Sequence, residues 1–206
     1  MTRQGAQSYK MSFSTGGLFL NESLEVARLH RDGEPWVATI ARALEEGATS
    51  LPKAASRRRT LREISNRIST LTSEELDFFI ADADRTEQQA LLWLATCRAY
   101  RFVQEFAIEV IRERFLSYQL DLHPESFDTV FDAKAEWDEG LAGISRSTRL
   151  KLRQVLFRMM REAGVISEER QIQTYHLSAR LKRLIAETRP ADLAIYPGIS
   201  VDGVLS

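Results

Sequence analysis

The sequence predicts an all-α protein, a compact multi-helix bundle, and three observations point to that class. First, apolar side chains recur every three or four residues along most of the 206-residue chain, the period of a helix packed on a core. Second, residue pairs able to cap a helix precede several of these apolar runs. Third, only ten glycines and five prolines occur, so long stretches contain no helix breaker. The 44% hydrophobic and 28% charged residues are typical of a folded domain.

Glycines and a proline delimit the first helices. We expect a helix over residues 16–31 that stops at Gly33, because glycine is common where a helix ends. Pro35, which is tolerated in a first turn, begins a second helix that ends at Gly47. The predicted buried stripe of this helix is Val37, Ile40, Ala41 and Leu44. A third helix is expected to bury Leu61, Ile64, Ile68 and Leu71.

Two residue pairs predict where the next helices start. Thr72 with Glu75 forms a capping box, in which each side chain accepts a hydrogen bond from the free backbone N–H of the other residue. Asp84 with Glu87 repeats this pattern. The first of these helices should bury Leu76, Phe79, Ile80 and Ala83. The second leads into the apolar run 90–97, and the helical period then continues to about residue 118 through Val103, Phe106, Ala107, Val110 and Ile111.

Two further helices are expected in the C-terminal part of the chain. A helix that begins at Pro124 and is interrupted by glycines at 140 and 143 should bury Phe127, Val130, Phe131 and Ala135. Ser145 or Ser147 can cap a long helix that Gly164 closes. Its inner face is expected to be Leu152, Val155, Leu156, Met159 and Ala163.

Strands are expected only after the long helix, as at most one small C-terminal β-hairpin. Residues 165–166 and 172–177 could pair around a turn at 167–170. Ser178 then caps a short last helix, and Pro190 ends regular structure. We therefore divide the chain into an N-terminal helical bundle (1–119), a C-terminal helical subdomain (120–190) and a tail (191–206).

The formal net charge of −1 conceals an uneven distribution of charge. The stretch 47–62 carries +5 and the stretch 145–161 carries +6, neither with an acid, while residues 120–139 carry −6. Because local patches create the electric field around a protein, a near-neutral total is compatible with a polyanionic ligand. The basic residues are Lys53, Arg57, Arg58, Arg59 and Arg62 in the first stretch, and Arg146, Arg149, Lys151, Arg153, Arg158 and Arg161 in the second.

The long helix supports two interpretations. A surface helix that needs charge only for solubility normally mixes signs, whereas Glu162 is the only acid here. Its arginines can straddle phosphates, and a helix followed by a hairpin is similar to the recognition helix and wing of a winged helix. Alternatively, they pair with acids such as Asp128, Asp132 and Glu136. The candidate nucleic-acid-binding residues are Arg57, Arg58, Arg62, Arg146, Arg149, Lys151, Arg153 and Arg158.

The first basic stretch lies at the N-terminal half of its helix, where positive charges oppose the helix dipole. A bound phosphate backbone or an acidic partner would offset that cost. Residues 13–18 (FSTGGL) could form a backbone cradle for an anion, but they lack the lysine and the spacing of a phosphate-binding loop. We therefore interpret these six residues as a helix start.

Nothing in the sequence indicates catalysis, a metal or a cofactor. The three histidines are isolated from each other, and the single Cys97 excludes an internal disulfide. No apolar run approaches the roughly 18 residues of a membrane span, and residues 1–10 lack the apolar stretch of a secretory signal. We expect a cytoplasmic, non-enzymatic protein. The tryptophans are expected in the core rather than as platforms for stacked bases: Trp36, Trp93 and Trp137.

Several short segments resemble one family. Residues 13–18 (FSTGGL) followed by 22–24 (ESL) are similar to the opening of the BrxA proteins of bacteriophage-exclusion (BREX) defence systems. Residues 91–93 (LLW), 111–116 (IRERFL) and, most specifically, 147–149 (STR) with 152–164 (LRQVLFRMMREAG) extend the resemblance. The resemblance implies an all-helical protein, similar in part to the antitermination factor NusB, that binds double-stranded DNA without catalytic activity. The arginines within the family motif are Arg149, Arg153, Arg158 and Arg161.

The leading hypothesis is a non-enzymatic DNA-binding accessory protein of a BREX system. Its expected partners are double-stranded DNA and other BREX proteins, with no cofactor and no membrane. Because few base-reading features are visible, we expect little sequence preference. Two alternatives stay open: an adaptor whose basic helix docks on an acidic protein surface, and RNA binding in the manner of NusB.

Overall fold

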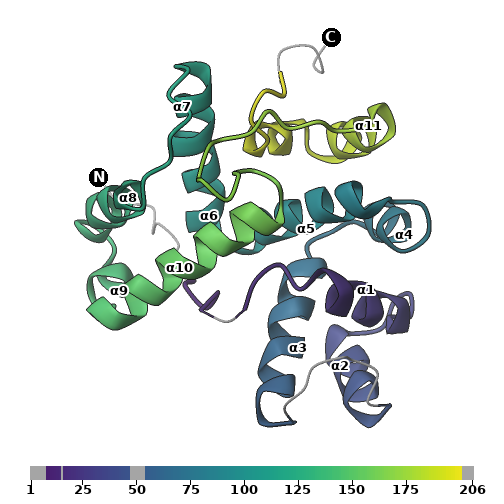
Figure 1. The fold of residues 1–206 in the computed structure, drawn as a ribbon. Coiled ribbons are helices and arrows are strands. Elements are labelled where there is room, and N and C mark those ends of the chain that lie inside the picture. The colour runs from purple at the N-terminus through teal and green to yellow at the C-terminus, as the bar shows by residue number, and fades with distance from the viewer. Residues whose placement is uncertain (1–7, 15, 47–53, 201–206) are drawn as a thin grey trace, which may run out of the picture.

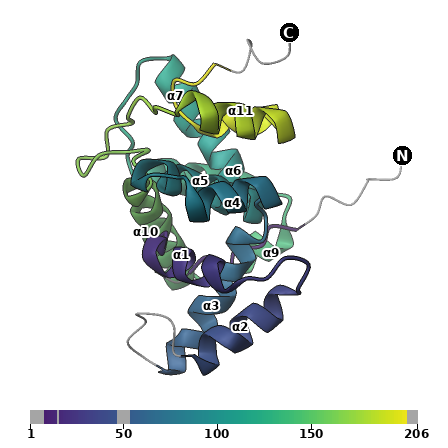
Figure 2. The ribbon, with the colours of Figure 1, turned by 90° about the vertical axis from the view of Figure 1, so that its right-hand side faces the viewer.

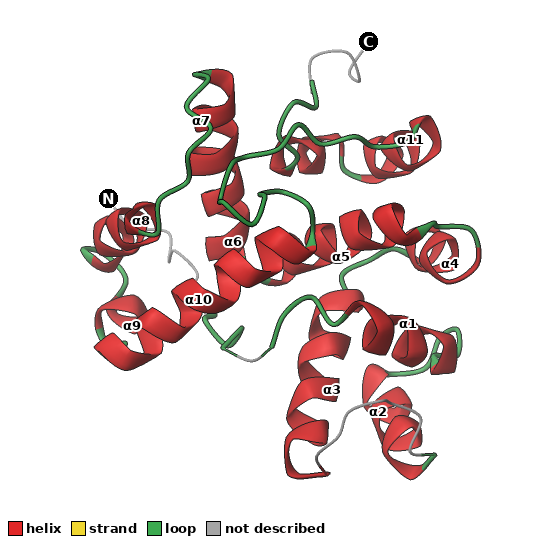
Figure 3. Ribbon diagram, viewed as in Figure 1, coloured by secondary structure: helices red, strands yellow, loops and turns green. Residues whose placement is uncertain are grey.

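The computed structural model describes residues 8–14, 16–46 and 54–200, and over these residues it consists of helices and loops with no β-sheet (Figure 3). The predicted all-α class is confirmed. Helices α1 (Leu20–Leu29), α2 (Trp36–Glu45) and α3 (Ala54–Ile68) pack on one another at one end of the molecule (Figures 1 and 2). Helix α5 (Arg85–Ala99) runs through the middle, and α11 (Ala179–Thr188) lies at the opposite end.

The buried face of α2 differs from the predicted stripe. Val37 is 76% exposed and Ala41 is exposed, whereas Thr39 and Ala43 are fully buried. The hydroxyl of Thr39 donates a hydrogen bond to Glu34 (2.8 Å) and lies 2.7 Å from the ring nitrogen of a histidine that precedes the helix. These hydrogen bonds form only when Thr39 faces inward. The prediction from hydrophobic periodicity was therefore wrong about which side of the helix is buried.

Both predicted capping boxes are confirmed. The hydroxyl of Thr72 and the carboxylate of Glu75 each accept the other residue's backbone N–H at the start of α4 (Ser73–Ala81). Asp84 and Glu87 do the same for α5. All eight residues from Ala90 to Cys97 are buried, which identifies α5 as the central helix, since only a helix covered on all sides is apolar all round.

A long helical rod follows, composed of α6 (Arg101–Phe106), a π-helix η1 (Ala107–Arg112) and α7 (Glu113–Leu116). Helix α8 (Glu125–Ala135) packs on it through aromatic side chains, and the ring of Phe127 lies 5.3 Å from the ring of Phe102. The short α9 (Glu139–Ala142) leads to α10 (Arg146–Glu162). Of the two serines considered for its cap, Ser145 is the one that accepts the backbone N–H of Thr148 (3.3 Å).

The expected β-hairpin is reduced to one isolated bridge between Ile166 and Ile172. The backbone N–H of Ile172 donates to Leu120 (2.8 Å), and the carbonyl of Arg170 accepts from Leu122 (3.0 Å). The expected turn does close, since residues 165–167 and 171–173 exchange two backbone hydrogen bonds of 2.9 Å. The same loop also bonds to the segment before α8, and no regular strand forms among the described residues.

The predicted tail is packed into the protein as far as the structure describes it. A 3₁₀ helix, η2 (Pro190–Ile195), follows α11, and Leu193, Ile195 and Tyr196 are buried. The indole N–H of Trp93 donates to the carbonyl of Ile195 (3.4 Å). Burial of these apolar side chains against the central helix orders a segment that contains Pro190, although the sequence predicts that regular structure ends at this residue. Residues 201–206 lie outside the described part.

One hydrophobic core spans both predicted domains. The buried cluster runs from Tyr9 to Tyr196 and includes Phe102 and Phe127, which lie on opposite sides of the predicted boundary at residue 119. Of the three tryptophans, Trp93 is fully buried, Trp36 stacks on a histidine ring, and Trp137 is 50% exposed, so core placement was wrong for Trp137. No helix among the described residues has the length and apolar character that a membrane crossing requires.

A buried ion-pair cluster joins α4, α5 and η2. The guanidinium of Arg98 contacts Glu75 (2.5 Å) and Asp192 (2.7 Å), and all three side chains are at most 7% exposed. We expect Arg98→Ala to lower the free energy of unfolding by about 3–5 kcal/mol, because two buried carboxylates lose their partner. The measurement is urea unfolding followed by circular dichroism.

The matched control is Arg180→Ala, which removes a pair with Asp82 whose side chains are 66% and 48% exposed. That loss should cost no more than about 1 kcal/mol, since solvent screens the pair. Equal losses in the two variants would show that the Arg98 cluster carries no special share of the stability.

Candidate nucleic-acid interface

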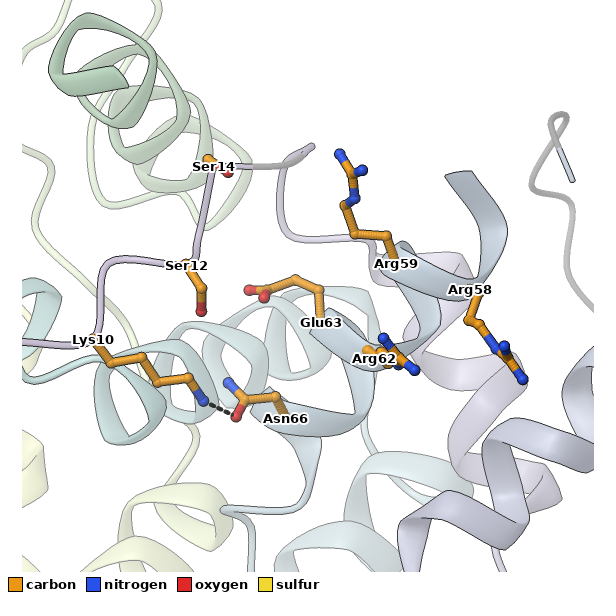
Figure 4. Close-up of a pocket in the computed structure, with 8 residues that line it drawn as sticks. All are labelled: Lys10, Ser12, Ser14, Arg58, Arg59, Arg62, Glu63 and Asn66. Atoms are coloured by element: carbon orange, nitrogen blue, oxygen red, sulfur yellow. Dashed lines mark hydrogen bonds between the residues drawn. The ribbon is translucent and has the colours of Figure 1, made fainter. Parts of the chain in front are cut away.

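A cavity of about 660 Å³ lies between α3 and the N-terminal segment, by which we mean residues 8–14 and 16–19 (Figure 4). One wall is formed by side chains of the N-terminal segment and the other by side chains of α3. We call this cavity the α3 pocket. Its lining residues are Lys10, Ser12, Ser14, Arg58, Arg59, Arg62, Glu63 and Asn66.

The hydrophobic face of α3 explains why its arginines point outward. Leu61, Ile64 and Ile68 are fully buried, as their spacing predicted. The opposite face of the helix therefore remains in solvent, and Arg58, Arg59 and Arg62 are exposed there. Within the described residues, none of these three arginines forms an ion pair with a carboxylate.

The negative charge of the one carboxylate that lines the pocket is balanced by a buried arginine. Glu63, only 7% exposed, accepts a hydrogen bond from the Nε of Arg67 (2.7 Å) and others from the hydroxyl of Tyr100 (2.6–2.7 Å). Burial, and then the negative charge of Glu63, raise the pKa of Tyr100 well above its usual value, so its hydroxyl stays a donor. Since Arg67 matches the charge of Glu63, the pocket keeps the positive charge of its other cations.

The N-terminal segment is fixed on both sides. Toward α3, the carbonyl of Gly17 accepts from Arg67 (2.8 Å), and Lys10 donates to Asn66. Toward α10, the backbone N–H of Leu18 donates to the carboxylate of Glu162 (2.5 Å). A Cβ at Gly17 would lie 2.1 Å from that carboxylate, so a larger residue there would displace the Glu162 side chain from Leu18.

The FSTGGL motif therefore has a structural role that differs from the one predicted. Helix α1 starts at Leu20 after Phe19, and no side chain caps it. Gly16 has a φ of 70°, a left-handed conformation that suits glycine, and Gly17 allows close approach to α10. The motif positions the N-terminal segment against α10 instead of capping a helix.

Two arginines of α10 are held by the acids of α8. Arg149 contacts Asp128 (2.8 Å) and Asp132 (2.5 Å), lies 4.7 Å from the centre of a phenylalanine ring, and is 22% exposed. Arg153 pairs with Asp128 as well. The alternative interpretation, in which the basic helix pairs with the acidic segment, is thus realised for these two residues. Their main visible role is to join α10 to α8.

The remaining predicted residues fall into different environments. Arg158 pairs with Glu162 (2.7 Å), whereas Arg146 and Lys151 are exposed and, among the described residues, make no ion pair. Arg57 is half-buried and does not line the α3 pocket. Lys53 lies outside the described residues. The predicted binding role of all these residues stays a prediction.

Sequence reasoning missed part of this pocket. Arg59 was within reach, because it belongs to the same arginine run as Arg58. Lys10, Ser12 and Asn66 could not be predicted, because no local sequence pattern indicates that the N-terminal segment packs against α3. No group of three or more His, Cys, Asp and Glu side chains in the described ranges could hold a metal ion.

The link between α8 and α10 should depend on pH. The hydrogen bond from Arg149 lowers the pKa of Asp132 below its ordinary value of 3.8. A carboxylate with a lowered pKa stabilises the fold above the unfolded value and loses that contribution as pH falls through the folded value. Asp132→Asn should therefore lower the free energy of unfolding at pH 7, and the deficit should shrink below about pH 4.

Urea unfolding of the wild type and the variant at a series of pH values measures this difference in the free energy of unfolding. The control is Glu136→Gln, directly after the same helix. Glu136 is an exposed acid that forms no ion pair with the described residues, so its substitution should have a small effect that varies little with pH. A deficit for Asp132→Asn that persists unchanged at pH 3 contradicts the assignment.

Comparison with known proteins identifies the family. The family model named BrxA matches residues 7–189. The BREX protein BrxA of Bacillus cereus (strain H3081.97) is 23% identical over 164 residues, which cover 80% of this chain and 82% of that protein. A crystal structure of an uncharacterized protein from Magnetospirillum magneticum has the same fold, with a TM-score of 0.77 and 21% identity over 92% of this chain and 99% of that one. The resemblance inferred from the short motifs is thus confirmed, and the chain belongs to the BrxA family.

Proposed function

We propose that this protein is a non-enzymatic, cytoplasmic DNA-binding component of a BREX phage-defence system, working beside other BREX proteins. It contacts the backbone of the DNA duplex with little sequence preference. The observation that carries the proposal is the cluster of Arg58, Arg59, Arg62 and Lys10 around the α3 pocket, whose one carboxylate is neutralised from within the protein. The family membership and the name of the Bacillus cereus relative, a BREX protein, support the proposal that this protein works in a BREX system.

The chemistry of the α3 pocket favours phosphate as the ligand. Guanidinium groups bind phosphate oxygens through two parallel hydrogen bonds, and serine hydroxyls and an asparagine amide add donors. Because Arg58, Arg59 and Arg62 form no ion pair with the described residues, a phosphate need not displace a carboxylate to reach them. In contrast, Arg149 and Arg153 would first have to leave Asp128.

A second candidate function is that of a protein-interaction adaptor, and exposed apolar side chains favour it. Leu116, Tyr118 and Leu120, at and after the end of α7, are 56%, 90% and 37% exposed. Tyr118 also has a φ of 56°, an uncommon backbone conformation for an aromatic residue. Such apolar side chains in solvent are typical of surfaces that bind other proteins. The two functions use different surfaces and are compatible.

Substitution of Arg58, Arg59 and Arg62 by Gln tests the DNA-binding proposal. If the wild-type protein engages about six phosphates, its affinity for a 25-base-pair duplex should fall on the order of a thousandfold between 50 and 200 mM salt. The triple variant should bind weakly, and the slope of log affinity against log salt should decrease by about three. Fluorescence anisotropy with a labelled duplex measures both quantities.

The matched control replaces Arg180, Arg183 and Arg189 by Gln, which removes the same charge from exposed positions at the α11 end of the molecule. It should retain most of the affinity and the slope. Equal losses in both variants, or a flat salt response of the wild type, would remove the support for this pocket. Competition with single-stranded RNA tests the NusB-like alternative, and loss of partner assembly with DNA binding intact would favour the adaptor.

A further inference from the structure

We infer that the DNA-binding face extends from the α3 pocket across the N-terminal segment to one side of α10, where Lys151 and Arg158 line it. The other side of α10, with Arg146, Arg149 and Arg153, lies outside this face. The inference rests on the proposed function and deepens it, because it assigns the two basic stretches to one duplex and divides the arginines of α10 into two groups.

Helix geometry places Lys151 and Arg158 on the side of α10 that meets the N-terminal segment. At 100° per residue, Lys151, Arg158 and Glu162 lie within about 40° of one another around the helix. Glu162 accepts the backbone N–H of Leu18, so this side of the helix faces the N-terminal segment. Arg158 also lines a cavity of about 330 Å³ together with residues 17–22. Lys151 lies on the same side, two turns nearer the start of the helix.

The opposite side of α10 faces α8. Arg146, Arg149 and Arg153 lie about 140–160° around the helix from the side just described. The ion pairs of Arg149 and Arg153 with Asp128 fix the direction of that side. Arg146 is exposed but points the same way, toward the acidic surface of α8. A phosphate there would meet the carboxylates of Asp128 and Asp132, which repel it.

The N-terminal segment connects the two basic walls. It is bound to α3 through Arg67 and Lys10 and to α10 through Leu18. Figure 1 shows the segment passing between α10 and α3. Two of the carboxylates that flank the segment, Glu63 and Glu162, are each engaged by an arginine. Positive side chains thus stand on both sides of the N-terminal segment.

A duplex fits this arrangement better than a small anion does. A single phosphate or a short peptide would be satisfied by the α3 pocket alone. The basic residues of α3 and those of α10 lie on either side of the N-terminal segment. They match a ligand that presents two rows of phosphates, as the strands on either side of a groove in DNA do. One row then meets Arg58, Arg59 and Arg62. The other meets Lys151 and the terminal nitrogens of Arg158, whose Nε is held by Glu162 while its side chain is 59% exposed.

Charge reversal at two positions of the same helix tests the inference. Lys151→Glu and Arg146→Glu both change an exposed side chain that makes no ion pair with the described residues, and they differ in which side of α10 they alter. For a 25-base-pair duplex at 0.1 M salt, Lys151→Glu should weaken binding about tenfold or more, and Arg146→Glu less than about threefold. Circular dichroism and thermal unfolding verify that both variants are folded.

A cross-linking measurement gives a readout that does not depend on charge. Since Cys97 is buried, a cysteine introduced at the surface can be labelled selectively with a photoreactive group. Labels at Arg62→Cys and Lys151→Cys should both cross-link to the duplex, and a label at Arg146→Cys should not. Cross-linking from Arg146→Cys but not from Lys151→Cys, or an equal loss of affinity in the two reversal variants, overturns the inference while DNA binding itself stands. A wild-type protein that binds no duplex overturns the proposed function.

Discussion

The arrangement of the candidate interface depends on one buried guanidinium, that of Arg67. This side chain is 1% exposed and holds together three parts of the molecule: the carboxylate of Glu63 on its own helix, the carbonyl of Gly17 in the N-terminal segment, and the face of the Phe19 ring, 5.8 Å away. Burying a charge is costly unless it is paired and hydrogen-bonded, and Glu63 supplies the pair. The same contact has a second consequence, because it removes the one negative charge from the α3 pocket.

The protein divides its arginines into those that hold the fold and those that remain available to a ligand. Arg67 and Arg98 are buried in ion-pair clusters, and Arg149 joins two helices by pairing with Asp128 and Asp132. Arg58, among others, lies in solvent without an ion pair to the described residues. The residue type is the same in both groups. The two groups differ in whether the fold places a carboxylate beside the guanidinium. For this reason the net charge of −1 says little about the charge of any one surface.

The motifs that relate the chain to the BrxA family are structural in large part. Gly17, in residues 13–18, and Glu162, in residues 152–164, meet where Leu18 donates to the Glu162 carboxylate. A side chain at Gly17 would occupy the space of that carboxylate, so the two motifs specify one joint between the N-terminal segment and α10. Relatives that are 21–23% identical to this chain share the fold or the family over most of their length. In this chain the joint orients the N-terminal segment between the two helices that line the candidate interface.

The sequence alone determined what depends on neighbours along the chain. The all-α class, both capping boxes, the buried face of α3 and the family followed from spacings of three to seven residues and from short motifs, since helix periodicity and capping are local properties. Tertiary structure decided which side of α10 faces acids and that Lys10 lines the same pocket as Arg58. It also decided how α2 is rotated around Thr39 and that the segment after Pro190 is buried. Each of these depends on contacts between residues far apart in sequence. Local patterns carry no record of such contacts, because the free energy that selects them comes from packing and from the pairing of buried charges.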